Sequence, residues 1–430
     1  MKAVLADRNF RWFLGGQFLS IFGDTSAWLA MGIWVRELTG SNAEAGLTFF
    51  FFTLATLCGP LAGVVVDRMH RRTVLVWGNL AGAAVVLGLL AVHGRGQVWV
   101  IWLVAFLYGV VAAFLDSGET ALLATMMPAD RLADANGLLS TSRQGVRLFG
   151  PLVGAAIFAV AGGGVVAVID AGTFVVAAGS LFFVRVDESA PVPEHRGWWH
   201  SVTAGAVHVW RDVVLRQVVS ATALACVVIG FLETLGFAVV TDGLHRRASF
   251  LGVLITIQGI GAVLGGVTAA WLIRRIGEGF AVGAALVLAG GGCALEVSSS
   301  LLLVAPGVAL LGLGLPWLIV ALTTLMQRRT PNELQGRVSA AVGVLVTAPQ
   351  TISIALGAAL VAVFDYRLLL VVVAVVMAAS GVLLVTRPEQ HPKRRAAAAA
   401  ADAAAAAAAA TAEAGAGEVV GTGPEPVEAG

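Results

Sequence analysis

The sequence predicts an all-α membrane protein, with about twelve transmembrane helices arranged as two pseudo-symmetric six-helix bundles. Composition is the first observation: of 430 residues, 58% are hydrophobic and 12% are charged, whereas about 25% of the residues of soluble domains are charged. The second observation is a series of apolar runs, each close to the roughly 20 residues that cross a bilayer. The third is a set of landmarks that recur in both halves of the chain, as expected for paired helical bundles.

Each apolar run is expected to form a helix, because hydrocarbon offers the backbone no hydrogen-bond partner and barrel strands would be about half as long. The division between the ninth and tenth runs falls near Ser300. The predicted helices cover residues 12–35, 44–66, 73–93, 98–125, 137–160, 164–185, 213–241, 250–273, 280–300, 302–326, 338–363 and 366–386.

The runs divide the chain into five segments. Between the sixth and seventh runs, a proline-bearing stretch is followed by Trp198–Trp210, which predicts a linker and then a helix on the inner membrane surface. The alanine-rich end of the chain predicts a disordered cytoplasmic tail. The predicted segments are an N-terminus at 1–11, bundles at 12–186 and 213–386, a central linker at 187–212 and a tail at 387–430.

Positive charges indicate the orientation of the helices. If residues 1–11 are cytoplasmic, about 20 of the 27 Lys and Arg residues lie at cytoplasmic helix ends. The pair Arg246 and Arg247, in a predicted outer loop, opposes this bias without reversing it. We therefore expect a multi-pass protein of the cytoplasmic membrane, with both termini in the cytoplasm.

The two halves also resemble each other at corresponding positions. GPLAGVVVDRMH, residues 59–70, closes the second run, and GVTAAWLIRRIG, residues 266–277, closes the eighth. Pro128 opens the loop before the fifth run, and Pro331 opens the loop before the eleventh. The offset between the members of each pair is slightly more than 200 positions. We infer that both halves follow one plan, which places a path between them.

The loop after the second run has the sharpest local pattern. Its glycines let two helices approach, and its one carboxylate lies among guanidinium groups. The segment resembles the loop motif of the major facilitator superfamily, G-x(3)-D-R-x-G-R-R, and the resemblance extends over about residues 8–386. His70 stands where the family usually has glycine. The residues of this latch motif are Gly59, Gly63, Asp67, Arg68, Arg71 and Arg72.

The resemblance implies a secondary transporter of the branch that contains drug, macrolide and siderophore exporters. It also implies that Asp67 helps to hold the cytoplasmic side closed. Its expected partner is the turn around Arg337 and Ser339, where a helix N-terminus favours an anion.

The fifth run contains a second pattern, similar to the antiporter-associated motif G-x(8)-G-x(3)-G-P-x(2)-G-G. Val146 and Ala155 occupy two of the expected glycine positions. Glycines at this spacing let a neighbouring helix pack closely, and the proline frees a carbonyl, but ordinary small-residue packing explains the pattern almost as well. The matching residues are Gly137, Gly150, Pro151 and Gly154.

Charges within the predicted helices are the third signal, because each one is costly unless it faces protein or a water-filled cavity. Burial and a nearby arginine act oppositely on a carboxyl, so a conformational change can load or release its proton. Structural ion pairs and direct substrate contact are the alternatives. Asp170 and Glu296 lie nearer helix ends and are expected to reach water. The candidates for proton coupling are Asp24, Asp116, Glu119 and Glu233, with Arg147 as the modulator and Arg143 as a further ion-pair partner.

Other classes of function find no support in the sequence. There is no Gly-rich loop with Lys-Ser/Thr, no GxSxG and no metal-ligand spacing within a run, so we expect neither an enzyme nor a cofactor or metal. A net charge of +1 without a basic stripe gives no surface for nucleic acid. Aromatic residues such as Trp28 and Tyr108 would suit an apolar substrate, although an interfacial belt also explains tryptophans near helix ends.

These patterns together predict a proton-coupled exporter of a drug-like, antibiotic or siderophore-like small molecule, with a role in antibiotic resistance among the possibilities. The alternatives are an importer or uniporter, or a non-transporting sensor or scaffold with the same fold. The expected partners are a small-molecule substrate, protons and the lipid bilayer, and we expect a monomer.

Overall fold

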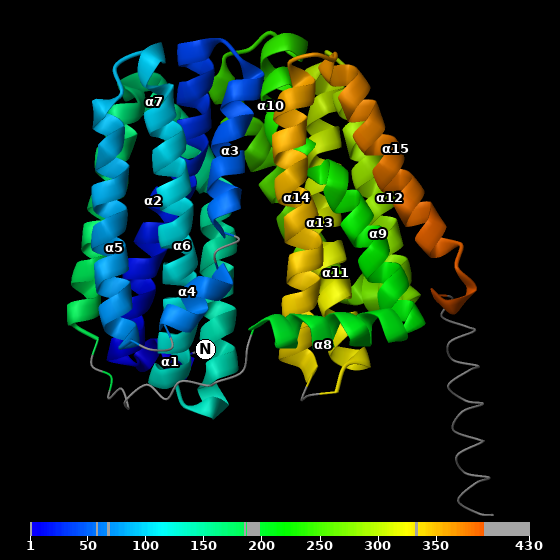
Figure 1. The fold of residues 1–430 in the computed structure, drawn as a ribbon, viewed down its shortest axis with the longest axis horizontal. Helices are drawn as coiled ribbons and strands as arrows, with labels where there is room; N and C mark the ends of the chain where they lie inside the picture. Colours follow the sequence, from blue (N-terminus) through cyan, green and yellow to red (C-terminus); the bar gives the residue numbers. More distant parts are fainter. Residues whose placement is uncertain are drawn as a thin grey trace, which may run out of the picture.

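The structure is a computed structural model that describes residues 2–56, 59–66, 69–184, 186, 198–331 and 334–390. The regular elements of these residues are all helices, and no strand occurs among them. The long helices stand side by side and span the height of the molecule (Figure 1). Ten helices of the described residues are long and apolar enough to cross a membrane. The predicted all-α membrane protein is therefore confirmed.

The N-terminal half supplies one group of helices, on the left of Figure 1. Helix α2 packs along α7, α3 packs against α6, and α5 lies against both α6 and α7. The helices of this group are α1 (Lys2–Ala6), α2 (Arg8–Thr39), α3 (Asn42–Thr56), α4 (Gly59–Val66), α5 (Arg71–Leu87), α6 (Val98–Met126) and α7 (Ala129–Phe182).

Helix α7 contains a break at Gly162, whose φ of 80° and ψ of 173° are not helical. Only glycine adopts such a backbone conformation easily, because it has no Cβ. The break divides the 54 residues of α7 into two helical segments, close to the predicted division between 137–160 and 164–185.

The C-terminal half supplies the second group, on the right of Figure 1. Helix α13 packs against α11 and α12, and α15 packs against α9 and α12. A π-helical segment, Val239–Gly243, continues α10. The helices of this group are α9 (Val213–Ile229), α10 (Phe231–Ala238), α11 (Leu251–Ile276), α12 (Glu278–Glu296), α13 (Leu301–Arg329), α14 (Gln335–Val361) and α15 (Tyr366–Val385).

Helix α8 (Trp198–Arg211) lies across one end of the second group, transverse to the long helices (Figure 1). It packs against α14 and α9. Gly205 makes this possible, because a Cβ there would meet the backbone of Arg337. Its location on a membrane surface stays a prediction.

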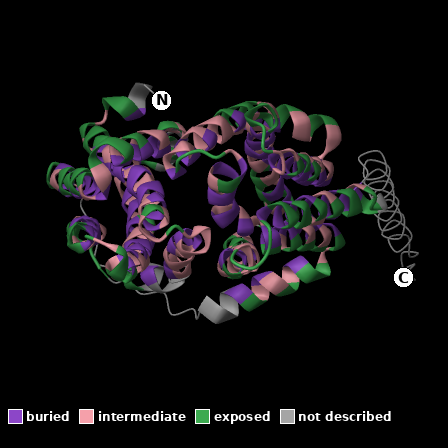
Figure 2. Cartoon of the chain, turned by 90° about the horizontal axis from the view of Figure 1, so that it is seen from above, coloured by how far each residue is buried: buried purple, intermediate pink, exposed green. Residues whose placement is uncertain are grey.

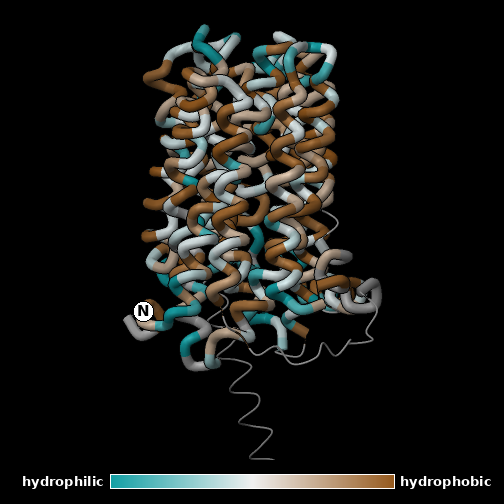
Figure 3. The backbone as a smooth tube through the Cα atoms, turned by 90° about the vertical axis from the view of Figure 1, so that its left-hand side faces the viewer, coloured by the Kyte–Doolittle hydropathy of each residue, from teal (hydrophilic) through white to brown (hydrophobic). Residues whose placement is uncertain are grey.

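Hydrophobic residues predominate along the length of the helices, and hydrophilic residues gather at the two ends of the molecule (Figure 3). Val160 and Leu302 are 90% and 85% exposed, as expected for side chains that face lipid. Seen from above, buried residues face neighbouring helices, and exposed residues lie mostly on the outer surfaces (Figure 2). This distribution fits a bilayer as the surrounding solvent.

Close backbone contacts hold neighbouring helices together, since burial of apolar surface away from lipid gives little driving force. A Cβ at Gly261 of α11 would meet the backbone of Ala309 of α13, and a Cβ at Gly265 would meet that of Leu313. Between the two groups, α3 packs against α10 and α14, and α7 packs against α11. There Phe49 of α3 stacks on Phe237 of α10, with ring centroids 5.9 Å apart.

Candidate functional site

A cavity of about 250 Å³ lies where α2 and α3 meet the helices of the second group. Trp28 and Phe49 line it from the N-terminal half, and their ring centroids are 4.5 Å apart. Leucine, isoleucine and valine side chains of α9–α13 form most of the remaining wall. Its volume lies slightly below the roughly 300–1,000 Å³ range of small-molecule pockets. The polar residues that line the cavity are Glu233 of α10, Gln258 of α11, Glu296 of α12 and Gln350 of α14.

Glu296 is buried in the cavity wall rather than hydrated at a helix end, so the expectation that it reaches water is wrong. Its side chain is 6% exposed, and its Oε1 atom has no hydrogen-bond partner. Two glycines explain the burial: Gly292 of α12 and Gly307 of α13 meet at this level, and a Cβ at Gly307 would contact the Gly292 carbonyl and the Glu296 side chain. Helix α13 thereby packs against the Cγ atom of the Glu296 side chain.

Asp24 of α2 and Asp170 of α7 share the hydroxyl of Tyr108 of α6. The Tyr108 Oη atom lies 2.6 Å from Asp24 Oδ1 and 3.0 Å from Asp170 Oδ2. Asp170 is 1% exposed, so the expectation that it reaches water is also wrong. It is covered because Gly23 lets α2 approach α7: a Cβ at Gly23 would meet the side chains of Asp170 and Thr173.

The number of protons that this cluster needs follows from its geometry. A tyrosine hydroxyl has one hydrogen, so it donates to one carboxylate at a time. The contact with the other carboxyl is a hydrogen bond only if that carboxyl is protonated and donates to Oη. Two hydrogen bonds among Asp24, Tyr108 and Asp170 therefore require one proton beyond that of the tyrosine.

The other predicted charges of this half form a second cluster. Arg143 of α7 donates from Nη2 to Glu119 Oε2 at 2.5 Å and from Nη1 to Asp116 Oδ1 at 3.3 Å. The Glu119 side chain is buried, whereas the Asp116 side chain is 68% exposed. Arg147 lies one turn further along α7 with an exposed side chain. The arrangement is that of an ion-pair cluster around Arg143, and the coupling roles of Glu119, Asp116 and Arg147 stay predictions.

The antiporter-like residues of α7 form the contact with α2. Ser26 Oγ donates to the carbonyl of Gly150 at 3.0 Å, and a Cβ at Gly154 would collide with the Ser26 backbone. Pro151 lies within the helix, and Gly137 lies in its early turns. The glycines thus act here in close packing, and a role in antiport stays a prediction.

The latch motif is described only in part, because Asp67 and Arg68 lie outside the described residues. Gly59 begins α4, and Gly63 lies within it. Arg71 donates to Thr125 Oγ1 at 2.7 Å, and Arg72 donates to the carbonyl of Phe182 at 3.1 Å. The two arginines therefore connect the start of α5 with the ends of α6 and α7. The contact predicted for Asp67 stays a prediction.

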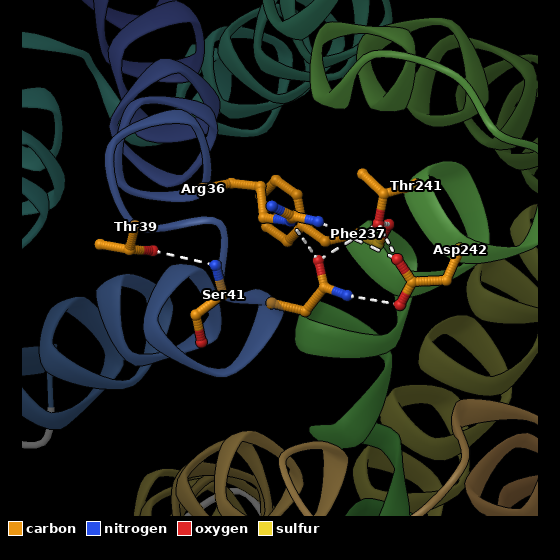
Figure 4. Close-up of polar contacts among 7 residues, drawn as sticks. Arg36, Thr39, Ser41, Phe237, Thr241 and Asp242 are labelled. Carbon is orange, nitrogen blue, oxygen red and sulfur yellow. Dashed lines mark hydrogen bonds and ion pairs between the residues drawn. The ribbon is translucent and has the colours of Figure 1, made fainter.

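At the opposite end, a polar cluster connects the two groups of helices (Figure 4). Arg36 Nε donates to Asn42 Oδ1 at 2.5 Å, and Asn42 Nδ2 donates to Asp242 Oδ2 at 2.9 Å. Arg36 also lies 3.9 Å from Asp242 Oδ1, and Thr241 Oγ1 donates to Asp242 at 2.8 Å. Side chains from both halves thus hold this end together. We call Arg36, Asn42, Thr241 and Asp242 the outer cluster.

Comparison with known proteins decides the family. The model of the Major Facilitator Superfamily matches residues 13–245 and 231–420. The chain belongs to this superfamily. Its members are multi-pass membrane transporters and not enzymes, which agrees with the class predicted for this chain.

The chain is similar to several members of the superfamily. It is 27% identical to macrolide efflux protein A of Streptococcus pyogenes over 176 residues, which cover 40% of this chain and 43% of that protein. The chain therefore aligns with less than half of that relative. It is also 27% identical to an uncharacterised MFS-type transporter of Mycobacterium tuberculosis over 74% of this chain and 76% of that one. Multidrug resistance protein MdtG of Proteus mirabilis is 31% identical over 33% of this chain and 36% of its own length.

Solved structures share the fold. A bacterial homologue of the iron transporter ferroportin, in an inward-facing state, superposes with a TM-score of 0.71 at 17% identity, over 88% of this chain and 99% of that one. An auto-inhibited peptide transporter of the POT family superposes with a TM-score of 0.69 at 11% identity, over 88% and 96%. At such identities the likeness shows the major facilitator fold alone.

Sequence reasoning missed the outer cluster and the roles of Tyr108, Asp170 and Glu296 as buried polar partners. One signal could have found part of the outer cluster. Arg36 and Asp242 carry opposite charges and are separated by slightly more than 200 positions, the offset of the internal repeat. Equivalent ends of the first and seventh predicted helices therefore carry complementary charges.

Proposed function

We propose that this transporter is a proton-coupled exporter of a drug-like, antibiotic or siderophore-like small molecule, acting as a monomer in the cytoplasmic membrane. The names of two relatives, macrolide efflux protein and multidrug resistance protein, support export of a drug-like compound. The excess of Lys and Arg at one set of helix ends supports cytoplasmic termini.

We assign twelve membrane spans in two six-helix bundles. A straight 54-residue helix would measure about 81 Å, against roughly 30 Å of hydrocarbon. We therefore divide α7 at Gly162 into two spans and join α3 with α4, and α9 with α10, into one span each. The cavity then lies at the interface of the bundles, where major facilitator transporters alternate access by rocking one half against the other.

The contacts at the outer end support this mechanism. The outer cluster connects the bundles at the end that the charge bias places outside, which closes that end. The likeness to a ferroportin homologue in an inward-facing state is consistent with this assignment. Export would then proceed by separation of the outer cluster, release of the substrate, and return to the closed arrangement.

The shared hydroxyl of Tyr108 is the observation that most supports proton coupling. The cluster of Asp24, Tyr108 and Asp170 needs one extra proton to form both of its hydrogen bonds, and it lies between α2, α6 and α7. A shift of α2 that separates Asp24 from Tyr108 breaks one of these hydrogen bonds and changes the proton affinity of the cluster. Movement of the bundle can in this way load or release one hydrogen ion.

Everted membrane vesicles test the proposal. Acidification of their interior should drive accumulation of a radiolabelled macrolide or a fluorescent dye, and a protonophore should abolish it. Asp24→Asn and Asp170→Asn should each reduce this accumulation by about tenfold or more, because proton-transfer groups typically contribute 10²–10⁴-fold. Asp365→Asn is the matched control, since Asp365 caps α15 by accepting a hydrogen bond from the Arg367 amide and asparagine caps equally well.

Two results would contradict the proposal. If both amide variants accumulate substrate as the wild type does, Asp24 and Asp170 do not carry the proton. If the wild-type protein equilibrates substrate whether or not the protonophore is present, the chain is a uniporter.

A further inference from the structure

We propose that the cavity binds an amphipathic organic cation, whose ammonium group is held by Glu296 and Glu233 and whose apolar part lies against Trp28 and Phe49. This inference specifies the substrate class of the proposed exporter and thus rests on that function. The charge, the burial and the shape of the cavity wall support it.

The charge of the cavity is unbalanced. Glu233 and Glu296 both line it, and none of the described residues that line it is a lysine, arginine or histidine. The arginine cluster around Glu119 contrasts with this arrangement, because there Arg143 contacts both nearby acids. The cavity therefore presents carboxyl oxygens to an occupant without a protein cation to neutralise them.

The unmet hydrogen bond of Glu296 points to a ligand. Buried polar side-chain atoms normally have a partner, and one left unpaired in a native protein demands an explanation. Glu296 Oε1 has none, although the side chain is 6% exposed and faces the cavity. A buried carboxyl must either carry a proton or meet a cation. A ligand ammonium placed in the cavity would supply both the charge and the hydrogen bond.

The aromatic residues favour an organic cation over a metal ion. Trp28 and Phe49 form a tilted pair with centroids 4.5 Å apart, and Phe237 stacks behind Phe49. Aromatic faces attract ammonium groups and bury apolar carbon, whereas hard metal ions prefer a shell of oxygen ligands. Most of the wall is aliphatic, and no group of three or more potential metal ligands occurs among the described residues. The occupant is therefore a molecule with one charged end and one apolar end.

A pair of ligands of equal shape tests the inference on the purified full-length chain in nanodiscs. Benzylammonium is a cation at neutral pH whose N–H groups can donate hydrogen bonds, and ethylbenzene is its neutral isostere with carbon in place of nitrogen. Equilibrium binding of each, measured by calorimetry or by saturation-transfer NMR, requires no transport and no proton gradient. Failure of this test would leave proton-driven export untouched, and failure of export would leave the binding result intact.

The variants Glu296→Gln and Glu233→Gln should each weaken binding of the cation by about tenfold or more, because a desolvated charge pair loses most of its energy when one partner is removed. Both variants should bind the neutral isostere as the wild type does, which also shows that the cavity remains folded. The control Glu44→Gln should bind both ligands normally, since Glu44 does not line the cavity and its carboxylate pairs with Arg95, at 3.7 Å.

Equal affinity of the wild-type protein for the two ligands would overturn the inference. So would unchanged cation binding in both glutamine variants. If Glu296→Gln fails to bind either ligand, Glu233→Gln decides the question by the same comparison.

Discussion

Removal of Asp242 should open the outer end of the transporter. Asp242 is the residue of the outer cluster that accepts from Asn42 at 2.9 Å and lies 3.9 Å from Arg36. Asp242→Ala deletes the two contacts that Asp242 makes with the other half, and it leaves the contact between Thr241 Oγ1 and Asn42 Oδ1, at 3.3 Å, in place. The equilibrium between closed and open outer ends should therefore shift toward the open state.

The size of the shift follows from these contacts. Two charges 4 Å apart interact by about 4 kcal/mol at an effective dielectric constant of 20, but the Asp242 side chain is 49% exposed. Exposed ion pairs contribute only about 0.2–1 kcal/mol. A hydrogen bond to a charged group adds about 1.5–3 kcal/mol, and partial exposure reduces that value. A total of about 1.4 kcal/mol is a conservative sum, and it corresponds to a tenfold change in the equilibrium.

Double electron–electron resonance between spin labels at His93 and Ser300 would measure the shift. Both residues are exposed at the outer ends of their groups, and the chain would carry alanine in place of its 3 cysteines. The ratio of long to short distances should rise by about tenfold in Asp242→Ala, and Asp365→Asn, at the same end, should resemble the parent protein. A distance distribution identical to that of the parent would refute the role of the outer cluster.

Three further substitutions test the packing. Gly154→Ala should destabilise the protein by about 1–3 kcal/mol, because its Cβ collides with the Ser26 backbone, and its melting temperature in detergent should fall accordingly. An unchanged melting curve would show that α2 and α7 separate at little cost. Gly162→Ala should destabilise the protein by about 1–2 kcal/mol, since φ is 80° there, and a rise in melting temperature would contradict this. Glu278→Gln should destabilise the protein by about 1–3 kcal/mol in the same assay, because the buried carboxylate accepts from Arg328 at 2.5 Å. Arg328→Ala leaves the carboxylate without this partner, so it should destabilise the protein at least as much as Glu278→Gln does. A smaller loss of stability in Arg328→Ala would contradict this expectation.

The helices could be predicted from the sequence because the bilayer fixes their length and polarity. The run predicted at 98–125 is α6, Val98–Met126, and the run at 302–326 is α13, Leu301–Arg329. Local patterns also located the break near Gly162 and the division near Ser300. These features depend on residues close together in the chain, so a single sequence contains them.

The environments of the site residues could not be predicted, because they depend on neighbouring helices. Asp170 and Glu296 were expected to reach water from helix ends, yet glycines on α2 and α13 let those helices cover them. The hydroxyl of Tyr108 lies between two acids from other helices, and the outer cluster joins residues about 200 positions apart. No periodicity reports such contacts, although the internal repeat gave a partial clue through Arg36 and Asp242.

Transport by the purified chain, reconstituted into liposomes with an acidic interior and no other energy source, tests proton-coupled export most directly. A dye added outside, at the cytoplasmic face of inside-out molecules, should accumulate above its external concentration while the interior becomes more alkaline. Both signals should vanish with a protonophore and in Asp24→Asn. Accumulation that persists without the pH gradient, or alkalinisation that occurs without the dye, would contradict proton-coupled export.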